Sequence, residues 1–424
     1  MDKFIVHGGA KLNGTVSISG SKNAALPILA ASLLTDEPCV IRNVPALSDI
    51  RTMGEVLGSL GMSVSHEQGI ARTILAEPDK TIAPWELVKK MRASISVLGP
   101  LVATRGVAEV SMPGGCAIGT RPIDLHLKGL EALGVKFTIE HGYVKGECEK
   151  LKGAEVYLGG HFGSSVLATA NVLSAAVLAE GETVISHAAA EPEIVDLANF
   201  LIAMGAKIEG AGSASIHVEG VDKLHGADHT VIADRIETIT FMMAAAITGG
   251  HVKLMGGVYS HLNAVVDTLG TIGVQVNKIP GGIEVLPAGK LEPVEVTTLP
   301  YPGFPTDGQA QLMALLTIAD GTSFVTERVF PDRFMHVSEL ARLGANIRRA
   351  GATAVVSGVK GLSGAQVMAS DLRASAALVI AGLVAKGDTD IYRVYHIDRG
   401  YERIELKLNA LGAGIERVEA ETQY

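Results

Sequence analysis

A chain of 424 residues is too long for one ordinary hydrophobic core and fits two domains of about 200 residues each. Hydrophobic residues make up 47% of the chain and charged residues 19%, which is the composition of a globular protein. The net charge of −9 argues against a nucleic-acid-binding surface, which normally carries a basic stripe.

The cysteines and the apolar stretches favour a cytoplasmic protein. Cys39, Cys116 and Cys148 lack metal-ligand spacing, which fits a reducing compartment and at most one reactive thiol. The first residues lack the basic-then-apolar pattern of a signal peptide. The longest apolar stretches, 24–34 and 374–385, are too short to span a bilayer. We therefore expect a soluble protein without a membrane or nucleic-acid partner, and its oligomeric state stays open.

Six copies of one pattern follow each other along the chain at a spacing of about 70 residues. In each copy an amphipathic segment ends in a glycine and continues into an alternating strand, as in LGSLGMSV from Leu57. The six glycines are Gly61, Gly134, Gly205, Gly273, Gly344 and Gly412. Each glycine lies where a helix would end in the left-handed conformation that glycine tolerates best.

A second helix recurs in phase with the first and is apolar around most of its circumference, which predicts burial on several sides. These helices run from Ala24, Ala93, Leu167, Ile236, Ala310 and Ala374. The strands that follow them are Cys39–Val44, Ala108–Met112, Thr183–His187, His251–Met255, Ser323–Val329 and Thr389–Val394. Each repeat is thus one exposed helix, one buried helix and about four strands.

Six such units, each too small to fold alone, would assemble as three plus three into two similar domains. The boundary between the third and fourth units falls near Ile232. The alternative is a single solenoid without domains, which the length of the repeat disfavours.

The buried helices begin with unusually polar residues. These starts are Ser21-Lys22-Asn23, Arg92-Ala93-Ser94, Ser164-Ser165, Asp234-Arg235, Thr306-Asp307 and Asp371-Leu372-Arg373. Acidic residues there are ordinary caps, whereas cations repel the positive end of a helix dipole unless an anion binds. A surface salt bridge explains any single arginine equally well. Several in repeat-related positions predict a convergent anion site for a ligand rich in phosphate and carboxylate.

Long motifs extend the argument to the whole chain. They are SGSKNAALP from Ser19, MRASI from Met91, PGGCAIGTRPIDLH from Pro113, EPEIVDLANFL from Glu191, DRIET from Asp234, FPTDGQAQ from Phe304, DRFMHV from Asp332, SGAQVMASDLRASAALV from Ser363 and YHIDRGYERIE from Tyr395. With these motifs the sequence resembles the enolpyruvyl transferase family, in the branch that uses UDP-N-acetylglucosamine.

The resemblance implies an α/β fold of two similar domains, each made of three βαβαββ-type units around buried helices (an inside-out α/β barrel). It implies domains at 22–232 and at 1–21 with 233–424, and an active site in the cleft between them. The implied reaction adds the sugar 3′-hydroxyl to C2 of phosphoenolpyruvate and then eliminates phosphate from a tetrahedral ketal. It implies no metal or organic cofactor, and it implies roles in peptidoglycan synthesis, cell shape and cell division, with sensitivity to fosfomycin.

Phosphoenolpyruvate carries a phosphate and a carboxylate, so it needs several cationic groups at once. The positions that match the family are Lys22, Asn23, Arg121, Arg333, Arg373 and Arg399. Lys22 and Arg399 are implied to act in catalysis as well. Asp307 matches the carboxylate that holds the sugar hydroxyl and takes its proton, although a helix cap after Thr306 is an alternative. Asp371 is either a second carboxylate near the reacting atoms or a partner of Arg373 or Arg399.

Cys116 lies in a glycine-rich run beside Arg121, which is too flexible for a core position. A thiol near cationic groups is predicted to have a lowered pKa and real reactivity. The resemblance implies that this thiol acts as a general acid near C3. Cys39 and Cys148 are interpreted as structural.

The resemblance also implies contacts to the sugar nucleotide. These residues are Arg92, Arg121, Pro122, Ile123, Asp124, Leu125, Gly163, Ser164, Ser165, Val166, Asp307 and Val329. A helix start is the alternative interpretation of Pro122. His126 and His336 each lie beside a helix, where they cap or pack.

The segment from His161 to Leu167 departs from the family pattern, because Leu167 stands where glycine is typical. Its paired serines resemble those of 3-phosphoshikimate 1-carboxyvinyltransferase, which is the alternative function. The Cys116 run and the RPIDLH segment argue against that alternative. A catalytically silent UDP-sugar-binding paralogue is the third hypothesis, and it would be expected to lack Cys116 or Asp307.

Overall fold

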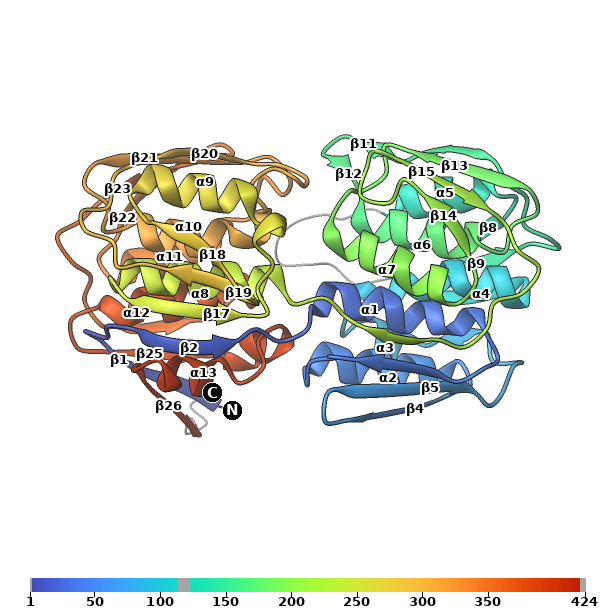
Figure 1. Cartoon of the computed structure of the whole chain (residues 1–424), viewed down its shortest axis with the longest axis horizontal. Coiled ribbons are helices and arrows are strands. Elements are labelled where there is room, and N and C mark those ends of the chain that lie inside the picture. The colour runs from blue at the N-terminus through green and yellow to red at the C-terminus, as the bar shows by residue number, and fades with distance from the viewer. Residues whose placement is uncertain (1, 113–122, 420–424) are drawn as a thin grey trace. The chain divides into compact units, whose positions relative to one another are not determined.

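The computed structural model of the protein describes residues 2–112 and 123–419. These residues divide into two compact units, each with its own hydrophobic core (Figure 1). The first unit contains residues 20–112 and 123–232, and the second contains 2–19 and 233–419.

Three mutually packed helices form the centre of each unit. In the first unit they are α1 (Lys22–Ala31), α4 (Leu98–Arg105, preceded by a 3-10 turn at Arg92–Val97) and α6 (Val166–Ala176). In the second unit they are α8 (Arg235–Ile247), α10 (Gln309–Leu316, preceded by a 3-10 turn at Thr306–Gly308) and α12 (Leu372–Val384). Nearly every residue of these helices is buried, as their all-round apolar sequences predicted.

Each repeat has a second helix, which comes after the buried helix in chain order and before the strands that end the repeat. These helices are α2 (Ser48–Ser59), α5 (Asp124–Ala132), α7 (Pro192–Ala203), α9 (Asn263–Ile272), α11 (His336–Arg342) and α13 (Ile404–Ala410). The six predicted glycines follow these helices with φ between 83° and 104°. The glycine stop signals are therefore confirmed, because this backbone conformation is strained for any residue with a Cβ. A further short helix, α3, spans Trp85–Val88.

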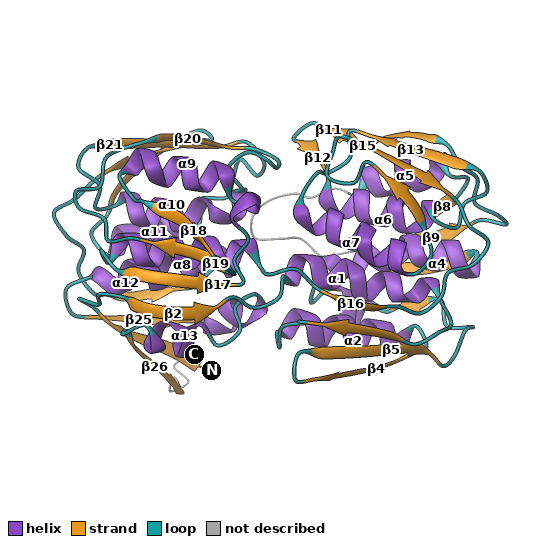
Figure 2. Ribbon diagram, in the orientation of Figure 1, coloured by secondary structure: helices purple, strands orange, loops and turns teal. Residues whose placement is uncertain are grey.

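Six four-stranded sheets cover the helices of the described residues (Figure 2). In the first unit, one sheet has the strand order β16 (Asp228–Thr230), β3 (Cys39–Arg42), β5 (Ile70–Leu75) and β4 (Met62–Glu67). The next has the order β6 (Ile82–Ala83), β7 (Val107–Ser111), β9 (Tyr143–Glu147) and β8 (Lys136–Glu140). The third has the order β10 (Glu155–Tyr157), β13 (Glu182–Ser186), β15 (Ser215–Glu219) and β14 (Lys207–Glu209). A small hairpin joins β11 (Gly159–Gly160) and β12 (Gly163–Ser164).

The second unit repeats this arrangement. Its sheets pair, in order, β18 (Val276–Ile279), β19 (Gly282–Val285), β17 (His251–Met255) and β2 (Asn13–Ser17); β20 (Glu295–Thr298), β21 (Thr322–Glu327), β23 (Thr353–Ser357) and β22 (Asn346–Ala350); and β24 (Gln366–Met368), β25 (Asp388–Tyr392), β1 (Asp2–His7) and β26 (Gly414–Glu419). With sheets outside and helices inside, each unit has the predicted inside-out α/β architecture.

Each unit closes into a ring because every sheet borrows one parallel edge strand from the preceding repeat. The strand β16 at the end of the third repeat pairs with β3 of the first. In the second unit β2 pairs with β17 in the same way, and β1 completes the sheet of β25 and β26. This circular pairing differs from a solenoid, in which the first and last repeats stay apart.

No helix among residues 2–112 and 123–419 is both long and apolar enough to cross a membrane.

Candidate functional site at the starts of the buried helices

Four of the six buried helices begin with a side chain that accepts a backbone N–H bond. The capping residues are Ser21, Ser165, Asp234 and Asp371. Asp371 illustrates the geometry, since its Oδ1 lies 2.8 Å from the backbone nitrogen of Arg373 and 3.1 Å from that of Ala374. Asp371 therefore caps α12, which is the ordinary role of an acidic residue at a helix start and differs from both interpretations specific to Asp371.

Asp307 uses its carboxylate to hold two arginines. Its Oδ1 lies 2.7 Å from Nη1 of Arg333, and its Oδ2 lies 3.2 Å from Nη2 of Arg373. Both guanidinium groups are buried, whereas 27% of the Asp307 side chain is exposed. The second unit thus brings three of the predicted site residues together, with the carboxylate on the accessible side.

Arg373 is the most deeply buried cation of this cluster. Burial disfavours its charged form, but Tyr401 and Asp307 outweigh burial and raise the pKa of Arg373 above its usual value. Its guanidinium lies 5.3 Å from the ring centroid of Tyr401. Its Nη1 is buried without a hydrogen-bond partner in the described part of the chain. A buried donor of this kind is satisfied when an anionic ligand binds.

Lys22 and Asn23 begin α1 in the first unit. Lys22 is buried, and its Nζ lies 3.1 Å from Oδ2 of Asp49, which is also buried. Asn23 is half-buried. The sequence did not point to Asp49, because an acidic residue in the first turn of α2 has an ordinary capping role.

Arg92 is half-buried at the start of the 3-10 turn before α4, close to the buried His126. Burial, reinforced by the charge of Arg92, lowers the pKa of His126 to about 3, so this imidazole is neutral. Nδ2 of Asn171 lies 2.8 Å from Nδ1 of His126 and 2.9 Å from the carbonyl oxygen of Ile95. His126 therefore packs inside the first unit, which is one of the two roles expected for it.

The other histidine of this type, His336, is buried at the start of α11. Burial lowers the pKa of His336 to about 4; the Asp371 carboxylate opposes the shift, and the Arg333 guanidinium adds to it. Its Nε2 lies 3.2 Å from the sulfur of Met313.

The start of α5 and the hairpin β11–β12 lie side by side in the first unit. Ile123 is buried, Asp124 is exposed and Leu125 is half-buried. A Cβ placed on Gly160 would lie 3.0 Å from Cδ1 of Leu125, so the hairpin backbone contacts this side chain. Two of the segments that the resemblance assigned to the sugar nucleotide are thus neighbours.

The segment after this hairpin leads into α6. Gly163 and Ser164 form β12, and Ser165 caps the helix with its Oγ 3.3 Å from the backbone nitrogen of Ala168. Val166 is half-buried as the first helical residue, and Leu167 packs against the core, as predicted. The capping interpretation therefore holds for Ser165.

Two further predicted residues, Val329 and Arg399, lie near the ends of a strand and of a 3-10 turn in the second unit. Val329 follows β21, and its backbone nitrogen lies 2.8 Å from Oε1 of Glu327. Arg399 is half-buried at the end of the 3-10 turn Val394–Arg399. Sequence reasoning missed Glu327, because a glutamate at the end of a strand gives no signal of a buried position.

Cys116, Arg121 and Pro122 lie outside the described residues. Cys39 is buried, and this burial raises the pKa of its thiol. Cys148 is half-buried. The burial and raised pKa of Cys39 agree with its structural interpretation.

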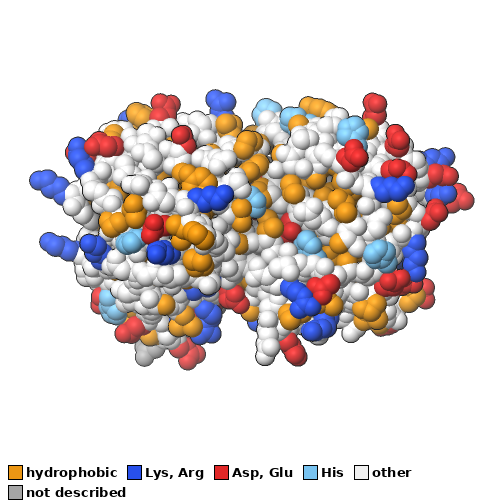
Figure 3. Space-filling view, in the orientation of Figure 1, with side chains coloured by type: hydrophobic (Ala, Val, Ile, Leu, Met, Phe, Trp, Pro, Cys, Tyr) orange, Lys and Arg blue, Asp and Glu red, His pale blue; other side chains and the backbone are white. Residues whose placement is uncertain are grey.

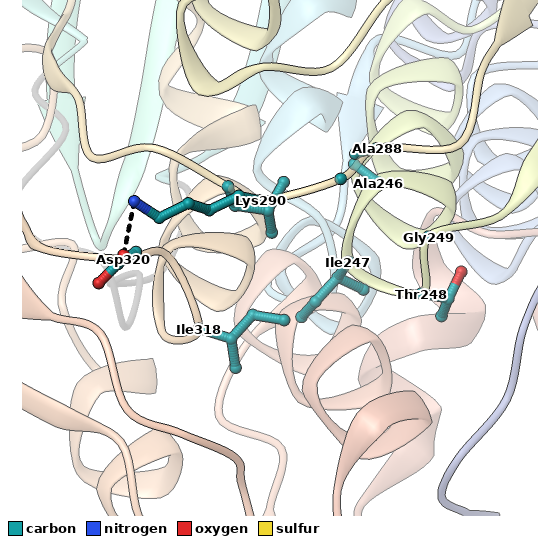
Figure 4. Close-up of a pocket in the computed structure, with 10 residues that line it drawn as sticks. Ala246, Ile247, Thr248, Gly249, Ala288, Lys290, Ile318 and Asp320 are labelled. Carbon is teal, nitrogen blue, oxygen red and sulfur yellow. Dashed lines mark ion pairs between the residues drawn. The ribbon is translucent and has the colours of Figure 1, made fainter.

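Two hollows lie at the opposite ends of the buried helices. One of about 330 Å³ lies beside the ends of α8 and α10, where Lys290 and Asp320 form an ion pair of 2.6 Å (Figure 4). One of about 740 Å³ lies at the matching position of the first unit and includes Leu34 and Arg105. None of the predicted site residues within 2–112 and 123–419 lines either hollow. On the face drawn in Figure 3, basic and acidic side chains are interspersed on both units.

Comparison with known proteins gives matches over nearly the whole chain. The family model described as EPSP synthase (3-phosphoshikimate 1-carboxyvinyltransferase) matches residues 6–408. A UDP-N-acetylglucosamine 1-carboxyvinyltransferase of Nitratidesulfovibrio vulgaris is 54% identical over 98% of this chain and 99% of its own length. One of Lawsonia intracellularis is 56% identical at the same coverage.

Solved structures agree with these matches. The enolpyruvyl transferase NikO from Streptomyces tendae has a TM-score of 0.89 at 26% identity and covers 99% of both chains. EPSP synthase from Acinetobacter baumannii has a TM-score of 0.76 at 19% identity, covers 99% of this chain and all of its own, and supports the fold alone. The chain therefore belongs to the enolpyruvyl transferase family, as its motifs predicted, and among the matched relatives it is similar to the UDP-N-acetylglucosamine 1-carboxyvinyltransferases.

Proposed function

We propose that this chain transfers the enolpyruvyl group of phosphoenolpyruvate to the 3′-hydroxyl of UDP-N-acetylglucosamine and releases phosphate. The transfer is the first committed step of peptidoglycan synthesis. The observation that carries the proposal is the identity of 54–56% to UDP-N-acetylglucosamine 1-carboxyvinyltransferases over 98% of the chain. The 3-phosphoshikimate enzymes share the fold at much lower identity.

Phosphoenolpyruvate would be bound by cations at the starts of the buried helices. In the second unit Arg333, Arg373 and Arg399 supply them, and in the first unit Lys22 supplies one beside Asn23. Arg373 supports this assignment best, because its buried Nη1 lacks a described partner and is ready for an anionic oxygen. Arg121 belongs to the same proposal from the sequence alone. These cations would also stabilise the charge that develops at C2 during addition and elimination.

Asp307 would hold the sugar 3′-hydroxyl and take its proton as that oxygen attacks C2. Its carboxylate is held by Arg333 and Arg373, and its partial exposure leaves room for a hydroxyl to approach. During the addition C3 gains a proton, for which the proposed donor is the Cys116 thiol. The tetrahedral ketal then loses phosphate and a C3 proton to give the enol ether.

The sugar nucleotide would contact mainly the first unit. The proposed contacts are Arg92, Arg121, Pro122, Ile123, Asp124, Leu125, Gly163, Ser164, Ser165 and Val166, with Asp307 and Val329 from the second unit. The neighbouring positions of the α5 start and the β11–β12 hairpin support this grouping. Free backbone N–H groups at the start of a helix suit the diphosphate.

Phosphate release tests the proposal directly. The purified chain is given phosphoenolpyruvate with UDP-N-acetylglucosamine in one reaction and with 3-phosphoshikimate in another. We expect release only with the sugar nucleotide, without added metal. Release with 3-phosphoshikimate alone supports the alternative enzyme. Tight binding of the sugar nucleotide without any release would instead identify a non-catalytic binding protein.

We further propose that Cys116 is the reactive thiol and the target of fosfomycin. A thiol-directed epoxide should label Cys116 and leave Cys39 and Cys148 unmodified, since Cys39 is buried with a raised pKa. The sugar nucleotide should accelerate labelling. Replacing Cys116 by Asp should keep proton donation and abolish the adduct. Peptide mapping reads the result, and a label on another cysteine contradicts the proposal.

The remaining proposals concern the whole protein. We propose that residues 22–232 form one domain and residues 1–21 with 233–424 form the other, and that both contribute residues to the reaction. We place the protein in the cytoplasm, where cell-wall precursors are made, and we expect its depletion to disturb cell shape and division.

A further inference from the structure

Glu327 is the last residue of β21, and its side chain is completely buried at 0% exposure. Its Oε1 accepts hydrogen bonds from the hydroxyl of Thr298 at 2.6 Å and from the backbone N–H groups of Val329 and Phe330 at 2.8 and 2.9 Å. Its Oε2 accepts one from the hydroxyl of Thr306 at 2.8 Å. Four donors on one buried carboxylate make a rigid junction between β21, the segment after it and the start of α10.

Thr306 connects this junction to the cluster of Asp307, Arg333 and Arg373. The hydroxyl of Thr306 donates to Glu327 and accepts a hydrogen bond of 3.1 Å from Nη1 of Arg333. The same nitrogen donates to Oδ1 of Asp307 at 2.7 Å. A continuous series of hydrogen bonds therefore joins Glu327 to the carboxylate that we assign to the sugar hydroxyl.

Four of the other five repeats end the corresponding strand in a different way. In four other repeats, the residue immediately after the strand that corresponds to β21 is left-handed, with φ between 56° and 86°. These residues are Asn43, His187, Gly256 and Arg393. Counted from the start of its strand, Glu327 occupies the same position as His187, Gly256 and Arg393, but it stays in the extended conformation. Its side chain holds the following backbone in place of the left-handed turn.

We propose that Glu327 is a positioning residue for the transfer reaction, fixing Asp307 and the backbone at Val329 relative to each other. The inference rests on the proposed function, because it takes both residues as contacts of the sugar nucleotide. A small displacement of a reacting group costs much of the rate, so Glu327, which three hydrogen bonds in series connect to Asp307, has a kinetic effect.

Two substitutions at Glu327 separate the two halves of the junction, which are the three hydrogen bonds at Oε1 and the one at Oε2. Glu327→Gln keeps an oxygen for the three donors at Oε1 but places an amide nitrogen where Thr306 donates. We expect kcat to fall about tenfold, with KM for UDP-N-acetylglucosamine within about twofold of wild type. Glu327→Ala removes both halves, so KM for the sugar nucleotide should rise about tenfold as well.

Substitutions at Thr306 test the same connection from its other end. Thr306→Val removes the hydroxyl and should reproduce the kcat loss of Glu327→Gln. Thr306→Ser keeps the hydroxyl and should recover most of the rate.

Ser323 offers a matched control on the same strand. It is completely buried in β21, and its Oγ lies 3.1 Å from the backbone nitrogen of Val294, away from α10. Ser323→Ala should lower the melting temperature, because a buried N–H loses its partner, while kcat and KM stay within about twofold of wild type. If both Glu327 variants behave like Ser323→Ala, Glu327 has only a structural role and the proposal is wrong.

Hydrogen exchange in the free protein separates this inference from the proposed function. The backbone amides of Val329 and Phe330 should exchange much faster in Glu327→Ala and near the wild-type rate in Glu327→Gln. Unchanged exchange in Glu327→Ala overturns the junction. If the wild-type chain releases no phosphate with either acceptor, the proposed function and the kinetic half of this inference fail together, while exchange still decides whether Glu327 orders the segment.

Discussion

The two units share one architecture but begin their buried helices with different chemistry. In the first unit the caps of α1 and α6 are hydroxyls, and basic residues stand in the first turns of α1 and of the 3-10 turn before α4. In the second unit the caps of α8 and α12 are carboxylates, and Asp307 lies in the 3-10 turn before α10. The same repeat therefore carries neutral caps in one unit and negative ones in the other.

This difference changes which ligand groups each unit suits. A hydroxyl cap satisfies one N–H group and leaves the positive end of the helix uncompensated, which favours a phosphate. A carboxylate cap compensates the dipole, and Arg333 and Arg373 of the second unit pair with the nearby carboxylate of Asp307. We infer that the first unit mainly binds the nucleotide and that the second supplies the groups for proton transfer.

Asp307→Asn is the substitution with the largest expected effect on this division of roles. An amide cannot take the proton of the sugar hydroxyl, so kcat should fall by about 10³-fold. Nucleotide affinity should change far less, because most of its proposed contacts lie in the first unit. Phosphate-release kinetics and calorimetric titration measure the two quantities.

Asp390 provides the control for the loss of an ion pair. Its Oδ2 lies 3.0 Å from Nζ of Lys3, and 21% of its side chain is exposed, close to the value for Asp307. Asp390→Asn should lower stability slightly and leave kcat unchanged. A kcat within tenfold of wild type in Asp307→Asn would remove the proton-transfer role from the second unit.

The next largest expected effect is on the pH dependence of stability, and it comes from two buried histidines. One lies in each unit, at equivalent positions of the repeat. His126 and His336 both precede the helix-ending glycine by eight residues, where the other four repeats carry buried apolar side chains. Those apolar residues are Met53, Leu197, Val265 and Ile404. The middle repeat of each unit has thus exchanged an apolar residue for an imidazole that burial keeps neutral.

Acid should destabilise the protein through these histidines. A folded-state pKa of about 4 for His336 lies below the unfolded value, so its stabilising contribution is complete above about pH 6.5 and is lost as the pH falls toward 4. His336→Met should therefore lose less stability than wild type between these pH values, by about 3 kcal/mol. Denaturant unfolding at pH 7.5, 6, 5 and 4 measures the difference. Parallel pH profiles for the two proteins would show that His336 does not titrate as its burial requires.

Most of the fold could be predicted from the sequence because its signals are local and repeated six times. The glycine at the end of each outer helix, such as Gly273, is required by a left-handed backbone and is visible in the sequence. The apolar circumference of α12 likewise indicates burial. The circular closure by β16 and β2 was not predictable, since short polar edge strands carry no periodic pattern.

The candidate site was predictable only where a residue belongs to a motif. Asp307 and Arg373 stand in long motifs, and the structure brings them together. Glu327 and Asp49 act through partners that are distant in sequence or set by side-chain packing, so single-sequence reasoning had no reason to single them out.

The smallest expected effect concerns the hydroxyl caps of the first unit and the serine pair before α6. The resemblance assigned both Ser164 and Ser165 to the sugar nucleotide. In the structure Ser165 caps α6 with an Oγ to nitrogen distance of 3.3 Å, which is also the distance of the Ser21 cap on α1. Ser165→Ala should therefore lower the free energy of unfolding by about 1 kcal/mol, and Ser21→Ala should lower it by a similar amount.

Ser164 lies in β12, where its backbone pairs with Gly159 and its half-buried side chain makes no cap for α6. Ser164→Ala should leave stability near the wild-type value and weaken binding of UDP-N-acetylglucosamine by about tenfold or more, the effect of one lost hydrogen bond to a charged group. Calorimetric titration and thermal unfolding of the three single variants distinguish the roles. If Ser164→Ala binds the nucleotide as wild type does, the diphosphate depends on backbone N–H groups and arginines alone. The contrast between the units would then rest on the missing carboxylates of the first unit and not on its hydroxyls.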